Sequence, residues 1–261
     1  MSYPNIEKLI NTIEILRSEN GCAWDREQTH KSLRHNMIEE AYEAVDAMNS
    51  GDMTHLKEEL GDVLLQVVLH AQIAKEEGAF NIDDVAKRLN EKLIHRHPHV
   101  FGNIHTQDTK VILDNWEKLK AEEKPHRTSV MDGVSKSQSA LMSAQKISNK
   151  AVKVGFEWEN DNQLKKCILS EFKEFQEAET YDNKEEEFGD ILFALVNLAR
   201  RNQIDAEQAL IRSNTKFMKR FRKMEELTKK PLKELSFDEW DELWKKAKKE
   251  ISNEETTQKH Y

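Results

Sequence analysis

Residues that interrupt helices or cross-link chains are scarce in this 261-residue sequence, which holds 4 Pro, 8 Gly and 2 Cys. The alternation of valine and threonine that is typical of β-strands is rare as well. Together with 34% charged residues, these absences predict an all-α protein whose helices are joined by short loops. The length allows one large domain or two of ordinary size.

The cysteines, the first residues and the net charge exclude several classes of protein. Cys22 and Cys167 lie far apart and in no CxxC spacing, which fits reduced thiols in a cytosolic protein. The opening MSYPNIEKLI lacks the order of an export signal, and no apolar run reaches the length of about 18 residues that spans a membrane. We therefore expect a cytoplasmic protein without membrane contact. The net charge of −8 argues against nucleic acid as a partner but is compatible with free nucleotides bound through a metal.

Acidic residues are abundant instead, and they recur at helical spacing beside an apolar helix. Residues 38–46 read IEEAYEAVD, and residues 58–71 read EELGDVLLQVVLHA. Like charges three or four residues apart repel, at about 0.2 to 0.5 kcal/mol per pair on an exposed helix. A single acidic pair usually marks only a solvated face. Here the second pair opens a helix that is apolar on almost every side, so we expect it to be buried and its carboxylates to need cations.

The same blocks return later, as LSEFKEFQEAE at 169–179 and EEEFGDILFALVNLA at 185–199. Further residues fall into register at offsets of 124 to 134: Gly21 and Trp24 with Gly155 and Trp158, Glu40 and Glu43 with Glu171 and Glu174, Asn90, Lys92 and Arg96 with Asn214, Lys216 and Arg220, and Trp116 with Trp244. A duplication followed by short loop insertions gives such a drift. We predict an N-terminal domain over 1–123, a linker over 124–136 and a C-terminal domain over 137–261.

Both copies then have the same plan of helices. In the first copy helices are expected over 4–18, 30–50, 53–77, 82–96 and 108–123. In the second copy they are expected over 137–152, 161–180, 183–203, 205–227 and 237–251. Gly51, Gly78 and Gly102 stand where helices of the first copy should stop.

Two pairs of carboxylates on neighbouring helices can converge. Glu40 and Glu43 are three residues apart on one helix, and Glu59 and Asp62 are three apart on the next, so an antiparallel pair of helices would aim all four at one point. Ligation by oxygen alone suits Mg²⁺, or Mn²⁺ as an alternative, and does not suit zinc. Four carboxylates over-neutralise one divalent ion, which leaves room for a second metal or for an anionic ligand such as polyphosphate.

Basic pairs on a later helix of each copy are candidates to hold phosphate oxygens. They are Lys92 with Arg96, and Lys216 with Arg220. A single such pair would usually be an ordinary pair on the surface. Because the pairs recur in both copies, a role in binding phosphate is as well supported as a place on the surface. Among the tryptophans, we expect Trp24 and Trp158 to pack, whereas stacking of Trp244 on a base is as well supported as packing.

The order and spacing of E-E-x-x-E, E-L-G-D and K-x-x-x-R, with the phrases GCAWDREQTH and RHPHVF, resemble the MazG-type nucleoside triphosphate pyrophosphohydrolases. The resemblance covers nearly the whole chain and matches the tandem form with two MazG domains. It implies tandem all-α NTP pyrophosphatase bundles completed by dimerisation. It also implies Mg²⁺-dependent cleavage of NTP or dNTP between the α and β phosphates, giving the monophosphate and pyrophosphate, as in housekeeping of the nucleotide pool.

The same resemblance implies roles for individual residues. The implied metal ligands are Glu40, Glu43, Glu59 and Asp62 in the first copy and Glu171, Glu174, Glu187 and Asp190 in the second. The implied substrate contacts of the second copy are Glu186, Lys216, Lys219, Arg220 and Trp244. As the base that takes a proton from the attacking water, we consider Glu171 or Glu186 in the second copy and Glu39 in the first.

One position departs from the family pattern. The leading E-E is Glu39-Glu40 in the first copy but Ser170-Glu171 in the second, which would slow the second site if the first Glu orders the water. The second copy, however, has the denser basic cluster KFMKR, whereas the first has KLIHR. Resemblance to tandem members favours the C-terminal site as the main catalyst, with the first copy structural, regulatory or weakly active.

Three alternatives belong to other classes of protein. A nucleotide-sensing regulatory protein with degenerate sites stays open because of Ser170. A di-iron bundle needs Glu-x-x-His on two core helices, and the two such pairs, Glu27 with His30 and Glu123 with His126, lie outside the acidic blocks. A zinc site in HRHPHVF is disfavoured by its proline and by the match to a family phrase.

Overall fold

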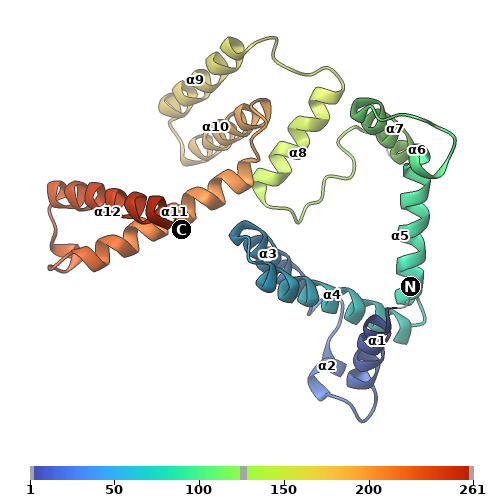
Figure 1. Ribbon diagram of the computed structural model, residues 1–261. Coiled ribbons are helices and arrows are strands. Elements are labelled where there is room, and N and C mark those ends of the chain that lie inside the picture. The colour runs from blue at the N-terminus through green and yellow to red at the C-terminus, as the bar shows by residue number, and fades with distance from the viewer. Residues whose placement is uncertain (1–2, 124–127, 259–261) are drawn as a thin grey trace. The chain divides into compact units, whose positions relative to one another are not determined.

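The computed structural model describes residues 3–123 and 128–258, and within these ranges it has twelve α-helices, one short 3-10 helix and no strand (Figure 1). The all-α prediction is therefore confirmed. The chain divides into two compact units, Met1–Pro125 and His126–Tyr261. Part of the predicted linker, residues 124–127, lies outside the described residues. No helix in the described ranges is long and apolar enough to cross a membrane.

The helices of the first unit are α1 (Pro4–Arg17), α2 (Ala23–Glu27), α3 (Arg34–Ser50), α4 (Met53–Glu76), α5 (Ile82–Arg96), α6 (Pro98–Phe101) and α7 (Thr109–Glu122). The second half of α4 is buried and forms the core with α1: Val68, Leu69 and Ile73 pack with Ile13 and Leu33. This is the burial that its apolar sequence predicts.

A two-residue turn joins α3 to α4 and fixes how their acidic residues face one another. Gly51 ends α3 with φ +75°, a left-handed conformation that glycine adopts without steric cost. The Asp52 side chain then caps α4 by accepting hydrogen bonds from the backbone N–H groups of Thr54 and His55. Because the turn is so short, α3 and α4 lie antiparallel along their length.

Two expectations for the first unit are wrong. The third helix starts at Arg34 instead of residue 30, because Thr29 and Ser32 each use a side-chain oxygen to accept the other's backbone N–H, which forms a turn. Trp24 does not pack within this unit, since its residue is 58% exposed. It lies on the five-residue helix α2. The contact of α2 with α1 leaves most of Trp24 open to solvent.

The helices of the second unit are α8 (Ala140–Lys153), α9 (Asp161–Glu177), α10 (Tyr181–Arg201), α11 (Ala206–Leu227) and α12 (Phe237–Gln258), with the 3-10 helix η1 (Leu232–Glu234) before α12. The helices α9 and α10 pack along their length, and α8 covers one face of α10. Figure 1 shows α11 and α12 as a helical hairpin. The first part of α11 also contacts α8 and α10.

The helix α10 is buried on one face only, so the prediction of an entirely buried helix is wrong here. Ile191, Ala194 and Val196 are buried against α8 and α9. Leu192, Phe193 and Leu195 remain 38–42% exposed. Their apolar side chains find no cover within the described residues of one chain, which leaves α10 with an uncovered hydrophobic face.

Candidate active site

Three predicted metal ligands converge in the first unit. Carboxylate oxygens of Glu40 and Glu43 on α3 and of Glu59 on α4 all lie within 4.8 Å of one another, and we call this group the first acidic cluster. Asp62 is outside the group but close enough for its charge to act on Glu40. Burial, and then the charges of Asp62 and Glu43, raise the pKa of Glu40 above its ordinary value. The fold thus holds mutually repelling carboxylates together.

Polar groups of the protein already contact this first cluster. The ring Nε2 of His55 lies 2.9 Å from a carboxylate oxygen of Glu59. The Nε2 of Gln66 donates to Glu40 at 3.4 Å. In the second unit the matching positions hold Asn183 and Ala194, which supply neither group. The sequence analysis did not predict these two contacts. A comparison of the two copies marks both positions, because the residue types differ there.

The second unit gathers a similar group. Carboxylate oxygens of Glu171 on α9 and of Glu187 and Asp190 on α10 lie within 4.8 Å of one another, and we call them the second acidic cluster. The fourth predicted ligand, Glu174, is not in the group and accepts a hydrogen bond from the Ser170 hydroxyl at 2.8 Å. Burial, and then the charges of Glu174 and Asp190, raise the pKa of Glu187.

A thiol borders the second cluster. Cys167 Sγ lies 3.6 Å from a carboxylate oxygen of Glu171 and donates to it. Burial, and then this hydrogen bond, raise the pKa of the Cys167 thiol, so the group stays protonated at neutral pH. A protonated thiol is a poor metal ligand, and the donor set of the cluster therefore remains all oxygen.

Both clusters fit a hard divalent cation. Ligand oxygens that share one Mg²⁺ lie up to about 4 Å apart, because each bond is about 2.1 Å long. Oxygens within 4.8 Å of one another reach that arrangement with small side-chain movements. A cation would also offset the burial and the repulsion that raise the pKa of Glu40 and of Glu187.

The predicted basic residues lie on helical hairpins, each with a tryptophan. In the second unit the guanidinium carbon of Arg220 on α11 lies 5.6 Å from the ring centre of Trp244 on α12. Lys216 and Lys219 are exposed on the same helix. In the first unit Arg96 on α5 lies 5.4 Å from the ring centre of Trp116 on α7. Each Arg of the predicted basic pairs thus lies beside a Trp, a contact that the sequence pattern did not predict.

The remaining predicted residues are less constrained. Glu39 and Glu186 are exposed next to their clusters, and Lys92 is half-buried on α5. The charge of Glu186 acts on Glu187, and that of Glu39 acts on Glu40. Both residues are therefore near the ligands while open to solvent, as a group that exchanges protons with water must be.

The acidic clusters and the basic hairpins belong to different helix pairs. The clusters lie between α3 and α4 and between α9 and α10. The helix α5 packs mainly on α6 and α7, and α11 packs mainly on α12. The described contacts within one unit therefore do not join carboxylates and basic residues into one pocket, which the sequence pattern alone did not reveal.

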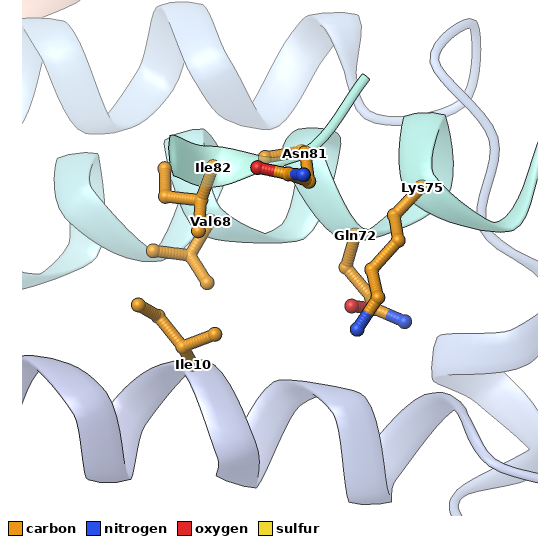
Figure 2. Close-up of a pocket in the computed structure, with 7 residues that line it drawn as sticks. Ile10, Val68, Gln72, Lys75, Asn81 and Ile82 are labelled. Atoms are coloured by element: carbon orange, nitrogen blue, oxygen red, sulfur yellow. The ribbon is translucent and has the colours of Figure 1, made fainter. Parts of the chain in front are cut away.

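A small cavity of ≈ 160 Å³ in the first unit lies away from all predicted site residues (Figure 2). Ile10, Val68 and Ile82 face one another on one side of it, and Gln72 and Lys75 lie on the other. Lys75 is paired with Glu14 at 2.8 Å. At this volume, and with its cation already paired, the cavity is not a triphosphate pocket.

Comparison with known proteins decides the family. Residues 28–101, which include the first acidic cluster and Arg96, match the family described as the MazG nucleotide pyrophosphohydrolase domain. The chain is also 48% identical, over 90% of its length, to the nucleoside triphosphate pyrophosphohydrolase/pyrophosphatase MazG of Thermotoga maritima, of which it covers 92%. The chain belongs to the MazG family. The resemblance drawn from its motifs is thereby confirmed.

Other relatives agree with this assignment. The chain is 40% identical over 85% of its length to the nucleoside triphosphate pyrophosphohydrolase of Escherichia coli K12, of which it covers 88%. It is 46% identical over 90% of its length to the uncharacterised protein YabN of Bacillus subtilis, of which it covers 49%. As a member of the MazG family, the chain is an enzyme, a hydrolase that acts on acid anhydrides.

Proposed function

We propose that this MazG protein hydrolyses NTPs and dNTPs between the α and β phosphates, with Mg²⁺, to the monophosphate and pyrophosphate. The observation that carries the proposal is the second acidic cluster, in which Glu171, Glu187 and Asp190 from two helices come within 4.8 Å of one another. We assign the main activity to this second unit and a regulatory or weak role to the first. Housekeeping of the nucleotide pool in the cytoplasm is the corresponding cellular role.

The acidic residues would hold the metal and manage the proton of the attacking water. Glu171, Glu187 and Asp190 are the proposed ligands, and Glu174 joins them if its side chain leaves the Ser170 hydroxyl. Bound Mg²⁺ supplies neutralisation of phosphate charge and a bound water of lowered pKa. Glu171 or the exposed Glu186 is the proposed base in this unit, as Glu39 is in the first.

The second hairpin would hold the polyphosphate. Arg220 is steadied by the face of Trp244, which leaves the edge of its guanidinium free to bind phosphate oxygens in a forked geometry. Exposed Lys216 and Lys219 add positive charge on the same helix. Together these groups would stabilise the negative charge that develops on the departing pyrophosphate. Trp244 also offers an aromatic face to a base.

A homodimer would bring the acidic and basic elements together. Phe217, Met218 and Phe221 line an open apolar groove on α11, and α10 keeps its own uncovered apolar face. Burying these faces against a second copy is favourable, at about 25 cal/mol per Å² of apolar surface. The acidic helices of one subunit would then receive the basic hairpin of the other. Nucleic acid and membranes are not among the proposed partners.

The full-length chain carrying Glu187→Gln tests the proposal. Pyrophosphate release from a panel of triphosphates with Mg²⁺ should fall by about 100-fold or more, since a ligand of the cluster loses its charge. Glu185→Gln, an exposed residue on the same helix, is the matched control and should keep its activity. Full activity of Glu187→Gln, with helical content unchanged by circular dichroism, would contradict the assignment.

A second candidate function has one specific observation in its favour. The Ser170 hydroxyl donates to Glu174, the one predicted ligand of the second unit that lies outside its cluster, and this bond would favour a site that binds nucleotide and hydrolyses it slowly. The chain would then be a nucleotide sensor. Tight binding of a triphosphate with no steady release of pyrophosphate would favour the sensor over the enzyme.

A further inference from the structure

The two Arg–Trp pairs are equivalent in geometry but not in surroundings. Arg96 and Arg220 occupy matching helix positions and lie 5.4 Å and 5.6 Å from the ring centres of Trp116 and Trp244. The helices α7 and α12 then continue in register beyond their tryptophans. The first and the seventh residues after each tryptophan can therefore be compared directly between the units.

In the first unit a carboxylate from the same hairpin holds the arginine. Glu123, just after α7, accepts from Arg96 Nε at 3.0 Å with one oxygen and from Nη2 with the other. Arg96 is only 8% exposed, and the Glu123 side chain is 19% exposed. The ion pair uses the forked edge that an arginine presents to a phosphate.

In the second unit the same positions carry no acid. Ile251 stands where the first unit has Glu123, and Lys245 stands where it has Glu117. The hydrogen bond that Arg96 donates to Glu123, and less strongly the charge of Glu117, raise the pKa of Arg96. Among the side chains that the structure describes, no carboxylate lies within ion-pair distance of Arg220. The guanidinium of the second unit is thus available where that of the first is occupied.

We propose that Glu123 occupies Arg96 in place of a substrate phosphate and thereby determines which of the two units takes up the triphosphate. The inference rests on the proposed function, in which these arginines bind the phosphate chain. A carboxylate tethered to the same hairpin competes at a high effective concentration, so a triphosphate from solution must displace it. The second unit has no such competitor at position 251 and binds substrate without that cost.

Substitutions at Glu123 in the full-length chain test this competition by binding alone. All variants in this test also carry Glu187→Gln and Arg220→Ala, so that the second unit neither hydrolyses triphosphate nor binds its phosphates. Calorimetric titration with a non-hydrolysable nucleoside triphosphate and Mg²⁺ then reports on the first unit. Adding Glu123→Ile, or the isosteric Glu123→Gln, should tighten binding about tenfold, comparable to releasing one charge-assisted bond. Adding Arg96→Ala as well should remove the gain.

The reciprocal change installs the competitor in the second unit of the otherwise native chain. Ile251→Glu should raise the KM for triphosphate about tenfold while kcat changes less, because the new carboxylate competes for Arg220 before substrate binds. Ile251→Gln is the control for size and polarity and should stay near the native KM. Thermal denaturation checks that each variant folds, and the isosteric Glu123→Gln carries the test if Glu123→Ile or Ile251→Glu does not fold.

Two outcomes would overturn the inference. One is unchanged triphosphate affinity in Glu123→Gln together with an unchanged KM in Ile251→Glu. The other is a gain in affinity that persists after Arg96→Ala is added, since it would then come from general charge. Failure of the proposed function looks different: the native chain would release no pyrophosphate from any triphosphate, while the affinity measurements would still give an answer.

Discussion

The hydroxyl of Ser170 donates a hydrogen bond at 2.8 Å to Glu174, which lies outside the group formed by Glu171, Glu187 and Asp190. In the first unit, Glu39 takes the place of Ser170, and its counterpart of Glu174, Glu43, lies within the cluster. Each unit therefore groups three of its four predicted ligands, but a different one stays outside the group: Asp62 in the first unit and Glu174 in the second.

Removing that hydroxyl should let Glu174 bind metal more readily. In Ser170→Ala the Mg²⁺ concentration that gives half-maximal pyrophosphate release should fall about two- to fivefold, since no hydrogen bond of about 1 kcal/mol has to be broken first. Ser170→Thr keeps a hydroxyl and is the matched control. An unchanged Mg²⁺ requirement in the alanine variant would show that Glu174 does not take part in metal binding.

Metal should stabilise the fold through the acidic clusters. Mg²⁺ should raise the melting temperature of the native chain and raise it less in Glu187→Gln, which lacks one ligand of the second unit. Without metal the same variant should melt about 1–2 °C higher than the native chain, because the neutral amide avoids the burial of a charge and the repulsion that raise the pKa of Glu187. Differential scanning calorimetry with and without EDTA measures both effects, and equal Mg²⁺ shifts in the two proteins would refute the ligand role.

Arg220 should be needed for substrate and should not be replaceable by lysine. Arg220→Ala should lower kcat/KM by about 100-fold, and Arg220→Lys should recover only part, because an ammonium neither forks to two oxygens nor stacks on Trp244 in the same way. Arg212→Ala, exposed on the same helix, is the control. Steady-state pyrophosphate release gives the comparison, and equal losses at both arginines would point to a general charge effect.

A histidine pair should make the stability of the first unit depend on pH. The rings of His30 and His70 stack 5.0 Å apart, with their Nδ1 atoms at 2.7 Å. Burial, and then the charge of His30, lower the pKa of His70 below its ordinary value of 6.5. The folded chain therefore binds fewer protons there than the unfolded chain, and stability falls as pH drops below 6.5 toward the lowered value.

Thermal denaturation between about pH 5 and 7.5 measures this dependence. His70→Gln should flatten the acid side of the curve by a few degrees. His35→Gln is the control, because the His35 side chain is 83% exposed. If the curve of His70→Gln followed that of the native chain, the pair would not be the source of the acid sensitivity.

Much of this fold could be predicted because its signals are local. Helical periodicity, glycine stops and acidic caps act over a few residues, and accordingly α4 and α11 begin or end within one residue of their expected bounds. The spacing of Glu40, Glu43 and Glu59 brought them to one point for the same reason, since one short turn relates their two helices. Local signals do not predict which surfaces of the helices pack against one another.

The missed features all depend on contacts between distant segments. The ion pair of Arg96 with Glu123 joins residues whose partnership no spacing rule gives. The exposed face of α10 depends on which surfaces other helices cover. A position-by-position comparison of the two copies would have marked Glu123 against Ile251 as a difference, without showing that the carboxylate reaches the arginine.

The turn at Gly51 and Asp52 has a further consequence. Because it places both pairs of acidic residues on a single hairpin, all the predicted metal ligands of the first unit lie in one contiguous stretch of the chain, from Glu40 to Asp62. A single duplication therefore copies every predicted ligand together, and the helices that carry the basic residues can then change separately in each copy.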